Sequence, residues 1–413
     1  MTKRIRKNGL LFGLTYMFVA LCLCGVVSAQ GNMPRPGTTI DKSNYNQYKE
    51  FFPEFFHEAF TTGWELVEPV KITIQATSPN PFPKPFLDAT ARNKGKYSID
   101  AEGYIAGGEY ESIAGFPFPD PDPNDKDFAA KIMWNYDYKY KCDSMHSEFM
   151  NFEKRRGESV TISTVESWQL QFQNRLYLDP KPLYKTKNGL RQINFLRNVY
   201  PPVQRNFMTL LVRYIDQKAP DATFLYLPSL RRTLRGEAGE RSTPIMSSTQ
   251  APDDFDGGFA GRTPEFTYKY LGEKKMIVLA DAKLGMKDMR DLEVEMVPVE
   301  SDGWQVKDVH IIEITPKDPK YPQGKKVVYI DKEHYWAYYA AAWDRAGALW
   351  KVWQTAVNKQ ANEAGEAYPY FKGMLGVDTQ LGYAVQMFAD WGANGENLKE
   401  SDVSPTSMRR RAR

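Results

Sequence analysis

Residues 224–280 read FLYLPSLRRTLRGEAGERSTPIMSSTQAPDDFDGGFAGRTPEFTYKYLGEKKMIVLA. The two ends of this stretch, 224–227 and 266–280, are rich in aromatic and branched apolar residues, which is typical of strands. The roughly forty residues between them are too many for an ordinary hairpin turn, and an insert of that length is usually functional or disordered. Disordered tracts are poor in aromatic residues. Because the insert contains Phe255 and Phe259, we expect it to fold back onto an apolar surface.

Charged residues of both signs follow one another within the insert. Its first half carries arginines and its second half carries carboxylates: Arg231, Arg232, Arg235 and Arg241, then Asp253, Asp254 and Asp256. Arginine forks match carboxylates in a two-bond geometry, so pairing across the insert is our first interpretation. Solvation without pairing and a bound cation are the alternatives, although the acidic run lacks the ligand spacing and the terminal Glu of an EF-hand loop.

The first 29 residues have the layout of a secretory signal peptide. Basic residues within 3–7 precede an almost wholly apolar run, 10–27, and small residues then lead to Ala29. We therefore predict cleavage after Ala29 and export to the periplasm, with an uncleaved membrane anchor as the alternative. Lipid attachment is disfavoured, because Cys22 and Cys24 each follow a leucine rather than a small residue.

The chain that follows this leader is nearly neutral. The whole sequence has 54 basic and 51 acidic residues, and the leader holds four of the basic ones and no acidic one. A strongly basic nucleic-acid-binding protein is therefore disfavoured. Cys142 is the single cysteine after the leader, which excludes an internal disulfide and a cysteine-based metal site.

An exported chain without disulfides depends on a large hydrophobic core. We assign that core to one large domain, residues 30–399, which follows the signal peptide of residues 1–29. The last residues, 400–413, are polar and basic. We interpret them as a solvated tail, for which contact with acidic lipid head groups is a minor option.

The segment 114–121 reads AGFPFPDP. Each proline lacks the backbone donor that a sheet ladder needs, so this segment cannot pair as an ordinary strand. Phe116 and Phe118 alternate with the prolines on an extended backbone. We expect both rings to be buried and to plug the end of an apolar interior.

Apolar residues alternate at spacing two along much of the chain, which favours antiparallel strands. We expect strands within 128–152, 158–178, 207–214, 223–227, 266–270, 276–280, 292–297, 306–314, 326–331, 335–342, 350–355 and 380–388. Two segments have helical spacing instead: 45–60, with a kink at Pro53, and 84–94. The Ala-rich run 337–348 could also be helical.

Three segments carry a family resemblance: YLPSLRRTLR, DDFDGGFAGRTPEFTYKYLGEKKM and AGFPFPDP. Together they resemble the bacterial envelope family known as domain of unknown function 1329, for which no activity is established. The resemblance covers most of the chain after the leader and implies a distant relation to periplasmic lipoprotein carriers of the LolA/LolB type. On this basis we predict an α+β fold. Its centre would be a large, curved antiparallel sheet, a half-barrel like that of the carriers, with helices on the concave face.

Common catalytic motifs are missing from the sequence. It has no Gly-x-Ser-x-Gly elbow and no Gly-x-x-x-x-Gly-Lys-Ser/Thr loop. Its four histidines are dispersed, so a histidine-based metal site is disfavoured. The nearest approach to an acid–base cluster is Glu333 and His334 beside Asp331, which we interpret as a solvated strand end. We expect neither an enzyme nor a cofactor.

The function that we expect is a non-enzymatic periplasmic carrier or binding protein for a lipid or other hydrophobic molecule. An apolar cavity with few polar groups is the usual form of such a site. The alternative is a structural or docking partner in an envelope transport complex. The family resemblance further implies an inner-membrane exporter of the resistance-nodulation-division type and an outer-membrane protein as partners, and no nucleic acid.

The candidate binding residues come from the segments described above. They are Phe116, Phe118, Arg231, Arg232, Phe255, Phe259 and Tyr268. We expect the insert, residues 231–261, to act as a lid or docking loop over the mouth of the cavity, because loops between rigid strands commonly carry the binding role.

Overall fold

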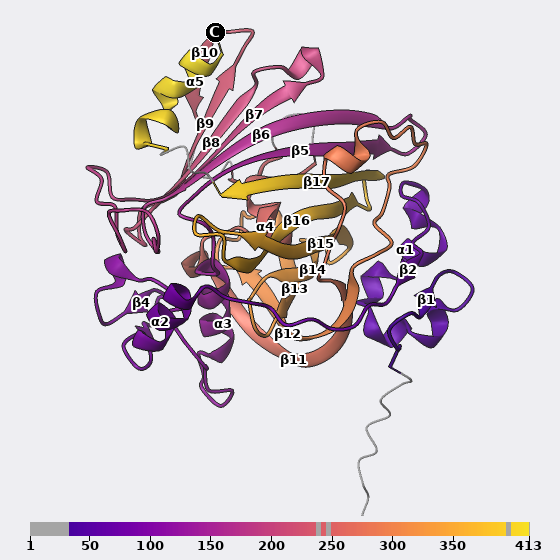
Figure 1. Cartoon of the computed structure of the whole chain (residues 1–413), viewed down its shortest axis with the longest axis horizontal. Helices are drawn as coiled ribbons and strands as arrows, with labels where there is room; N and C mark the ends of the chain where they lie inside the picture. The colour runs from indigo at the N-terminus through magenta and orange to yellow at the C-terminus, as the bar shows by residue number, and fades with distance from the viewer. Residues whose placement is uncertain (1–32, 237–240, 245–248, 394–397, 413) are drawn as a thin grey trace, which may run out of the picture.

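The computed structural model describes residues 33–236, 241–244, 249–393 and 398–412. Among these residues, one curved, unclosed sheet of thirteen antiparallel strands has the order β10-β9-β8-β7-β6-β5-β17-β16-β15-β14-β13-β12-β11 (Figure 1). Its strands are β5 (Ser144–Arg155), β6 (Thr161–Gln171), β7 (Leu190–Tyr200), β8 (Met208–Tyr214), β9 (Ala222–Leu227), β10 (Arg232–Arg235), β11 (Phe266–Leu279), β12 (Trp304–Pro316), β13 (Gln323–Asp331), β14 (Ala337–Asp344), β15 (Leu349–Ala361), β16 (Ala367–Asp378) and β17 (Tyr383–Ala393). The predicted α+β class with a large, curved antiparallel sheet is confirmed.

The sheet consists of two runs of sequential neighbours, β5 to β10 and β11 to β17. They join where β5 pairs with β17, so that Phe149 lies opposite Ala389. This join lets one continuous surface combine residues from both halves of the chain. Four further strands form two small pairs: β1 (Thr39–Ile40) with β2 (Ile72–Thr73), and β3 (Ser98–Ile99) with β4 (Ile105–Ala106).

Helical segments among the described residues are short. The α-helices are α1 (Glu58–Thr61), α2 (Lys84–Arg92), α3 (Phe128–Asp137), α4 (Phe255–Gly258) and α5 (Pro405–Arg411). The 3-10 turns are η1 (Tyr45–Gln47), η2 (Lys49–Phe51), η3 (Glu54–Phe56), η4 (Gly63–Glu65), η5 (Tyr110–Ser112), η6 (Pro202–Gln204), η8 (Pro252–Asp254), η9 (Thr263–Glu265), η10 (Lys287–Met289) and η11 (Glu400–Asp402). No helix in this part of the chain is long and apolar enough to span a membrane.

Helices contact both faces of the sheet. On one face, α4 packs against β14 so closely that a methyl group on Gly258 would lie 2.5 Å from the Cβ of Ala340. On the other face, the ring of Phe56 at the end of η3 packs on Tyr339, with 5.2 Å between ring centroids. Adjacent residues of a strand point to opposite faces, so Tyr339 and Ala340 mark two different surfaces. The expected place of the helices on the concave face stays a prediction.

The prediction of a strand throughout residues 128–152 is wrong, because its first part is the helix α3. This helix is buried over most of its circumference, including Phe128, Ile132, Trp134 and Tyr136. A helix that is buried nearly all round has apolar residues at every spacing, so its sequence also satisfies a period of two. The strand expected there begins only with β5.

Other differences from the sequence prediction have local causes. Residues 45–60 form separate turns and the start of α1 rather than one helix, and Pro53 is extended between two of them. The helix expected at 84–94 is confirmed as α2. The segment 292–297 is not a strand, and the Ala-rich run 337–348 is strand β14 followed by a turn rather than a helix.

In the large sheet, the strands β7, β10 and β16 were not predicted, and neither were the four short strands β1 to β4. In β16, Pro369 and two glycines interrupt the apolar alternation that identifies a strand. The backbones approach closely at one of these glycines, since a Cβ on Gly373 would lie 2.2 Å from the carbonyl oxygen of Met387.

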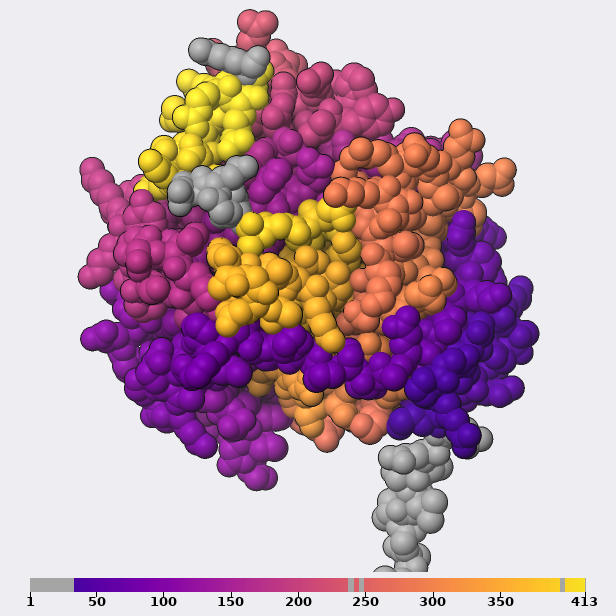
Figure 2. All heavy atoms as spheres, in the orientation of Figure 1, coloured from indigo at the N-terminus to yellow at the C-terminus, as the bar shows by residue number. Residues whose placement is uncertain are grey.

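A segment near the start of the described chain and its C-terminal end both pack on the sheet. Residues 75–83 run as an extended strap from β2 to α2 across the face seen in Figure 2, and the Ser78 amide donates to Gln305 on β12. At the other end, α5 contacts β9 and β10, and Val403 and Met408 are fully buried. The expectation of a fully solvated tail is therefore wrong.

Candidate functional site

The two halves of the insert between β9 and β11 have different environments. The arginine-rich half turns back and forms β10, which is an edge strand of the sheet. Arg231 and Arg232 are exposed there, and in the described part of the chain neither forms an ion pair with the acidic half. The predicted pairing across the insert is therefore wrong for both of these arginines.

In the acidic half, Asp254 is fully buried between two lysines of the sheet. One carboxylate oxygen lies 3.0 Å from Nζ of Lys326 on β13, and the other lies 2.8 Å from Nζ of Lys351 on β15. The backbone amide of Ala251 also donates to this carboxylate, at 3.1 Å. Burial alone would raise the pKa of Asp254, but the two lysine charges outweigh burial and lower the pKa to about 2. Asp254 therefore anchors the insert to two central strands.

Asp256 makes a second anchor to a different part of the fold. Its Oδ2 atom lies 2.8 Å from Nζ of Lys141 and 3.3 Å from Nζ of Lys139. Burial lowers the pKa of Lys139 to about 7, against the opposing attraction of Asp256. The phenol of Tyr136 on α3 donates to the carbonyl oxygens of Asp256 and Phe259. These contacts attach the insert to α3 and to the segment that follows it.

Asp253 is the acidic residue that pairs with an arginine of the insert. Nε of Arg241 lies 2.8 Å from its Oδ1 atom, which confirms one of the predicted Arg–Asp pairs. Arg241 also approaches Asp221 before β9, which in turn pairs with Arg213 on β8 at 3.0 Å. Alternating charges thus continue from the insert into the sheet, and burial of their side chains leaves little screening by solvent.

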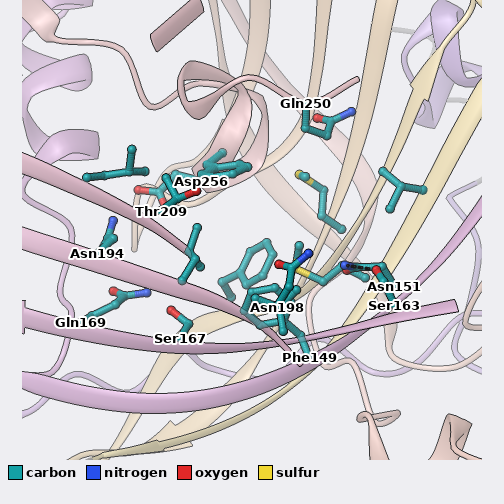
Figure 3. A pocket seen from close by; sticks show the side chains of 18 of the residues that line it. Phe149, Asn151, Ser163, Ser167, Gln169, Asn194, Asn198, Thr209, Gln250 and Asp256 are labelled. Atoms are coloured by element: carbon teal, nitrogen blue, oxygen red, sulfur yellow. Dashed lines mark hydrogen bonds between the residues drawn. The ribbon is translucent and has the colours of Figure 1, made fainter. Parts of the chain in front are cut away.

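A cavity of about 160 Å³ lies between the acidic half of the insert and the sheet (Figure 3). Its wall comes from six strands that are consecutive in the sheet, β8, β7, β6, β5, β17 and β16. Gln250, Phe255 and Asp256 line it from the insert. The cavity therefore spans the join between the two halves of the sheet.

Most of the exposed wall of this cavity is apolar. The aliphatic and aromatic side chains are Phe149, Val165, Leu196, Leu211, Phe255, Tyr370, Phe371, Met374, Val385, Met387 and Trp391. Between them stand neutral polar side chains and two carboxylates: Asn151, Ser163, Ser167, Gln169, Asn194, Asn198, Gln204, Thr209 and Gln250, with Glu153 and Asp256. A mostly apolar wall with a few directed polar groups can hold an amphiphilic molecule.

Part of the polar wall is ordered by a short chain of hydrogen bonds. The Asn151 amide donates to Ser163 Oγ at 3.1 Å, and Ser163 donates to Glu153 at 2.9 Å. The phenol of Tyr383 donates to the other oxygen of Glu153. Because the Nδ2 atom of Asn151 is the donor in this chain, its Oδ1 atom is left as a buried acceptor without a hydrogen-bond partner among the described residues.

The candidate residues from the sequence lie in several places. Of the seven, Phe255 lines the cavity, and the other six do not. Phe259 is buried behind it, against Phe266 at 5.0 Å between ring centroids. Tyr268 is half-buried on the edge strand β11, where its phenol donates to the carbonyl of Thr263 at 2.7 Å. Their role in binding stays a prediction.

Phe116 and Phe118 are both buried, at 6% and 5% exposure, but in two different clusters. The ring of Phe116 packs on Phe86 of α2 and on Tyr335, with centroid distances of 4.8 and 4.7 Å. Phe118 belongs to a separate group with Trp134. The Pro-rich segment therefore fastens the α2 and α3 region to the sheet, away from the cavity.

The predicted solvated strand end at Asp331 is wrong for His334. This ring is fully enclosed, and its Nε2 atom lies 3.3 Å from Asp331 and 3.0 Å from the phenol oxygen of Tyr338. Burial lowers the pKa of His334, although Asp331 opposes the effect. Within the described ranges, no group of three or more His, Cys, Asp or Glu side chains could hold a metal ion.

Sequence reasoning missed the polar half of the cavity wall. Ser163, Ser167 and Gln169 lie on one face of β6 with Val165 among them, and in the sequence such a mainly polar face is typical of a solvated one. The pattern gives the face of the strand but does not tell whether another segment covers it. The buried lysines at 326 and 351 were missed for a related reason, since lysine in a strand usually indicates an exposed position.

Residues 39–409 match the family model described as "Protein of unknown function (DUF1329)". No match to a curated protein was found. Among solved structures, a domain from Vibrio parahaemolyticus named for outer membrane lipoprotein sorting is 18% identical, with a TM-score of 0.50 over 68% of this chain and 97% of that domain.

Two further solved structures are similar. A DUF1329 family protein from Desulfovibrio piger is 15% identical, with a TM-score of 0.49 over 67% of this chain and 96% of the other. A LolA superfamily protein from Nitrosomonas europaea is 12% identical, with a TM-score of 0.41 over 67% of this chain and 97% of the other. At such identities, structural similarity speaks for the fold alone.

Proposed function

Since this chain belongs to the DUF1329 family, we propose that it is a periplasmic binding or carrier protein for a lipid or another hydrophobic molecule. The likeness to a domain named for lipoprotein sorting supports the proposal at the level of the fold. The observation that carries it is the mostly apolar cavity between six strands of the sheet and the anchored insert.

The physical task of such a carrier is to keep apolar surface out of water. Each methylene that moves into water costs about 0.8 kcal/mol, and a shielding cavity offsets this cost. An engineered cavity of about 150 Å³ with an apolar lining binds benzene, so a cavity of 160 Å³ can hold a ring or a short length of acyl chain. A complete lipid would need the insert around Phe255 to move outward.

The proposed compartment rests on the leader. Residues 1–29 lie outside the described residues, and cleavage after Ala29 stays a prediction that the intact mass of the exported protein tests. A mass that includes the leader, or a lipid adduct on Cys22 or Cys24, would contradict it.

The carrier proposal is tested by binding of the uncharged fluorescent probe N-phenyl-1-naphthylamine. Leu211 lines the cavity and is 5% exposed, so Leu211→Trp should fill the space and weaken probe binding at least about tenfold, or about 1.4 kcal/mol. The matched control is Leu381→Trp, in a turn where Leu381 is 67% exposed. Leu196→Phe is a milder filler if melting shows that Leu211→Trp does not fold. Equal probe binding by the folded fillers and by the control would refute the cavity as the binding site.

A second function, docking of a partner protein, is favoured by the edge strand β10. Leu230 and Leu234 are 56% and 44% exposed beside the exposed pair Arg231 and Arg232. An edge strand offers unpaired backbone groups to a partner strand. An inner-membrane exporter and an outer-membrane protein are the partners that we propose for this edge, on the basis of the family resemblance.

A further inference from the structure

We propose that the cavity binds the uncharged, hydrogen-bonding head group of an amphiphile, such as an alcohol or an amide, and discriminates against carboxylate and phosphate head groups. This inference rests on the carrier function proposed above and specifies the class of its ligand. Three features of the cavity wall carry it: the charges, the unpaired polar atoms and the apolar surface between them.

The charged groups of the wall are already satisfied by the protein. None of the described residues that line the cavity is Lys, Arg or His. Glu153 accepts hydrogen bonds from Ser163 and Tyr383, and the Oδ2 atom of Asp256 lies between two lysine ammonium groups. An anionic head group would therefore enter beside two carboxylates without a cation of its own, and burial of an unpaired charge is strongly unfavourable.

Lys139, one of the two lysines behind Asp256, does not offer that cation. Lys139 is 2% exposed, and its ammonium group also donates to the carbonyl oxygen of Tyr136 at 3.0 Å. The same ammonium nitrogen lies 3.6 Å from the centroid of the Tyr136 ring and 4.6 Å from that of Trp336. Its charge is thus directed toward Asp256 and the rings rather than toward the cavity.

Four buried polar atoms of the cavity-lining residues have no hydrogen-bond partner among the described residues. They are Asn151 Oδ1, Asn194 Oδ1, Thr209 Oγ1 and Trp391 Nε1. Asn151 is 9% exposed and Thr209 is fully buried. Buried polar atoms in proteins are paired in the large majority of cases, so each of these four atoms calls for a partner, and a head group bound in this cavity would supply it.

The kinds of atom specify complementary chemistry. Amide oxygens at Asn151 and Asn194 need a donor, whereas the indole N–H of Trp391 needs an acceptor. A hydroxyl or a secondary amide supplies both, while a carboxylate supplies acceptors alone. The apolar wall between these atoms, including Phe149, Val165 and Met387, would surround the adjoining hydrocarbon.

The test is displacement of N-phenyl-1-naphthylamine at pH 8 by two chain-matched competitors, 1-dodecanol and dodecanoate. Because both have twelve carbons, the difference between them reports the head group. We expect dodecanol to bind at least about tenfold more tightly than dodecanoate. Equal competition, or tighter binding of dodecanoate, would overturn this inference and leave the carrier proposal standing. Failure of the probe and of both competitors to bind would instead refute the carrier proposal and the inference together.

Two variants identify the atoms that discriminate. Thr209→Val is isosteric and removes a hydroxyl from the cavity wall. It should therefore weaken the binding of dodecanol about fivefold to tenfold and leave the binding of dodecanoate nearly unchanged. Thr267→Val, at an exposed position on β11, is the matched control. Glu153→Gln removes one carboxylate from the wall and should strengthen the binding of dodecanoate at least threefold. If Thr209→Val behaves like the control and Glu153→Gln does not change dodecanoate binding, the assignment of these side chains to the head-group site is wrong.

Discussion

The two halves of the insert between β9 and β11 are close in sequence and opposite in environment. The arginine-rich half turns at the outer edge of the sheet, where Arg231 and Arg232 meet solvent. The acidic half is largely buried, with Asp254 at 0% exposure. A single charged loop thus contains one segment that is available to a partner and one that is fixed to the core.

The difference between the halves comes from the partners that the sheet supplies. Asp254 meets Lys326 and Lys351, which lie 72 and 97 residues further along the chain. Arg231 and Arg232 have no such acidic partner in the described part of the chain. Charge order within a loop therefore does not decide which of its residues are paired, because the decisive partners belong to distant strands.

The largest effect should follow from removing the Asp254 carboxylate. Asp254→Ala leaves two lysines buried without their counter-ion, and breaking a buried ion pair costs about 3–5 kcal/mol. Chemical denaturation measures this loss, and Asp291→Ala, at an exposed position, is the matched control. A loss below about 1 kcal/mol would place Asp254 among ordinary surface pairs and contradict its role as an anchor.

The close approach of α4 to the sheet predicts the next effect. Gly258 has φ +98°, and a Cβ there would lie 2.5 Å from Ala340. Gly365 also has a positive φ, +78°, but nothing lies within 4 Å of its Cβ position. Gly258→Ala should therefore cost about 1–3 kcal/mol more than Gly365→Ala, which shares the backbone strain without the steric overlap. Equal losses in the two variants would show that the insert is packed loosely.

The pH dependence of stability should also depend on the Asp254 anchor. The folded pKa of Asp254, about 2, is below the ordinary value of 3.8, so the unfolded chain binds more protons between these values. Stability from this group is present above pH 3.8 and is lost as the pH falls through about 2, on the order of 2 kcal/mol in total. Asp254→Asn should flatten this acid limb in denaturation measured at several pH values. An unchanged slope would assign the acid sensitivity to other carboxylates.

The smallest effect is expected at the exposed edge. Reversing the charge in the double variant Arg231→Glu/Arg232→Glu should change stability by no more than about 0.5 kcal/mol. Probe binding should also stay unchanged, since neither arginine lines the cavity. Loss of co-purification with an envelope partner, at normal melting, would support docking at β10. Unfolding of this variant would show instead that the pair is a buried clamp.

The sequence predicts the sheet well where apolar residues recur at alternate positions of a strand. Strands β8, β9 and β13 follow their predicted ranges closely for this reason. Prediction fails for α3, because a helix that is buried on nearly all sides has no alternation between an apolar and a polar face. It fails for β16 because two glycines and Pro369 interrupt the alternation of apolar residues. The period of the apolar residues alone therefore does not distinguish α3 from a strand, or β16 from a loop.

The site was less predictable than the fold. Phe255 was identified because a phenylalanine among aspartates is unusual for a solvated loop, and it does line the cavity. Asn151, Asn194 and Thr209 come from three different strands and have no shared signal in the sequence. They meet only because β5, β7 and β8 lie in register beneath the insert.

The most direct test of the account is native mass spectrometry of the protein purified from its own envelope, followed by extraction of any bound lipid. We predict that the wild type retains an uncharged lipophile, that the Arg231→Glu/Arg232→Glu variant retains it too, and that Leu211→Trp does not. A wild-type protein without bound mass, or a folded Leu211→Trp variant that carries the same ligand, would contradict the claim that this cavity is the binding site.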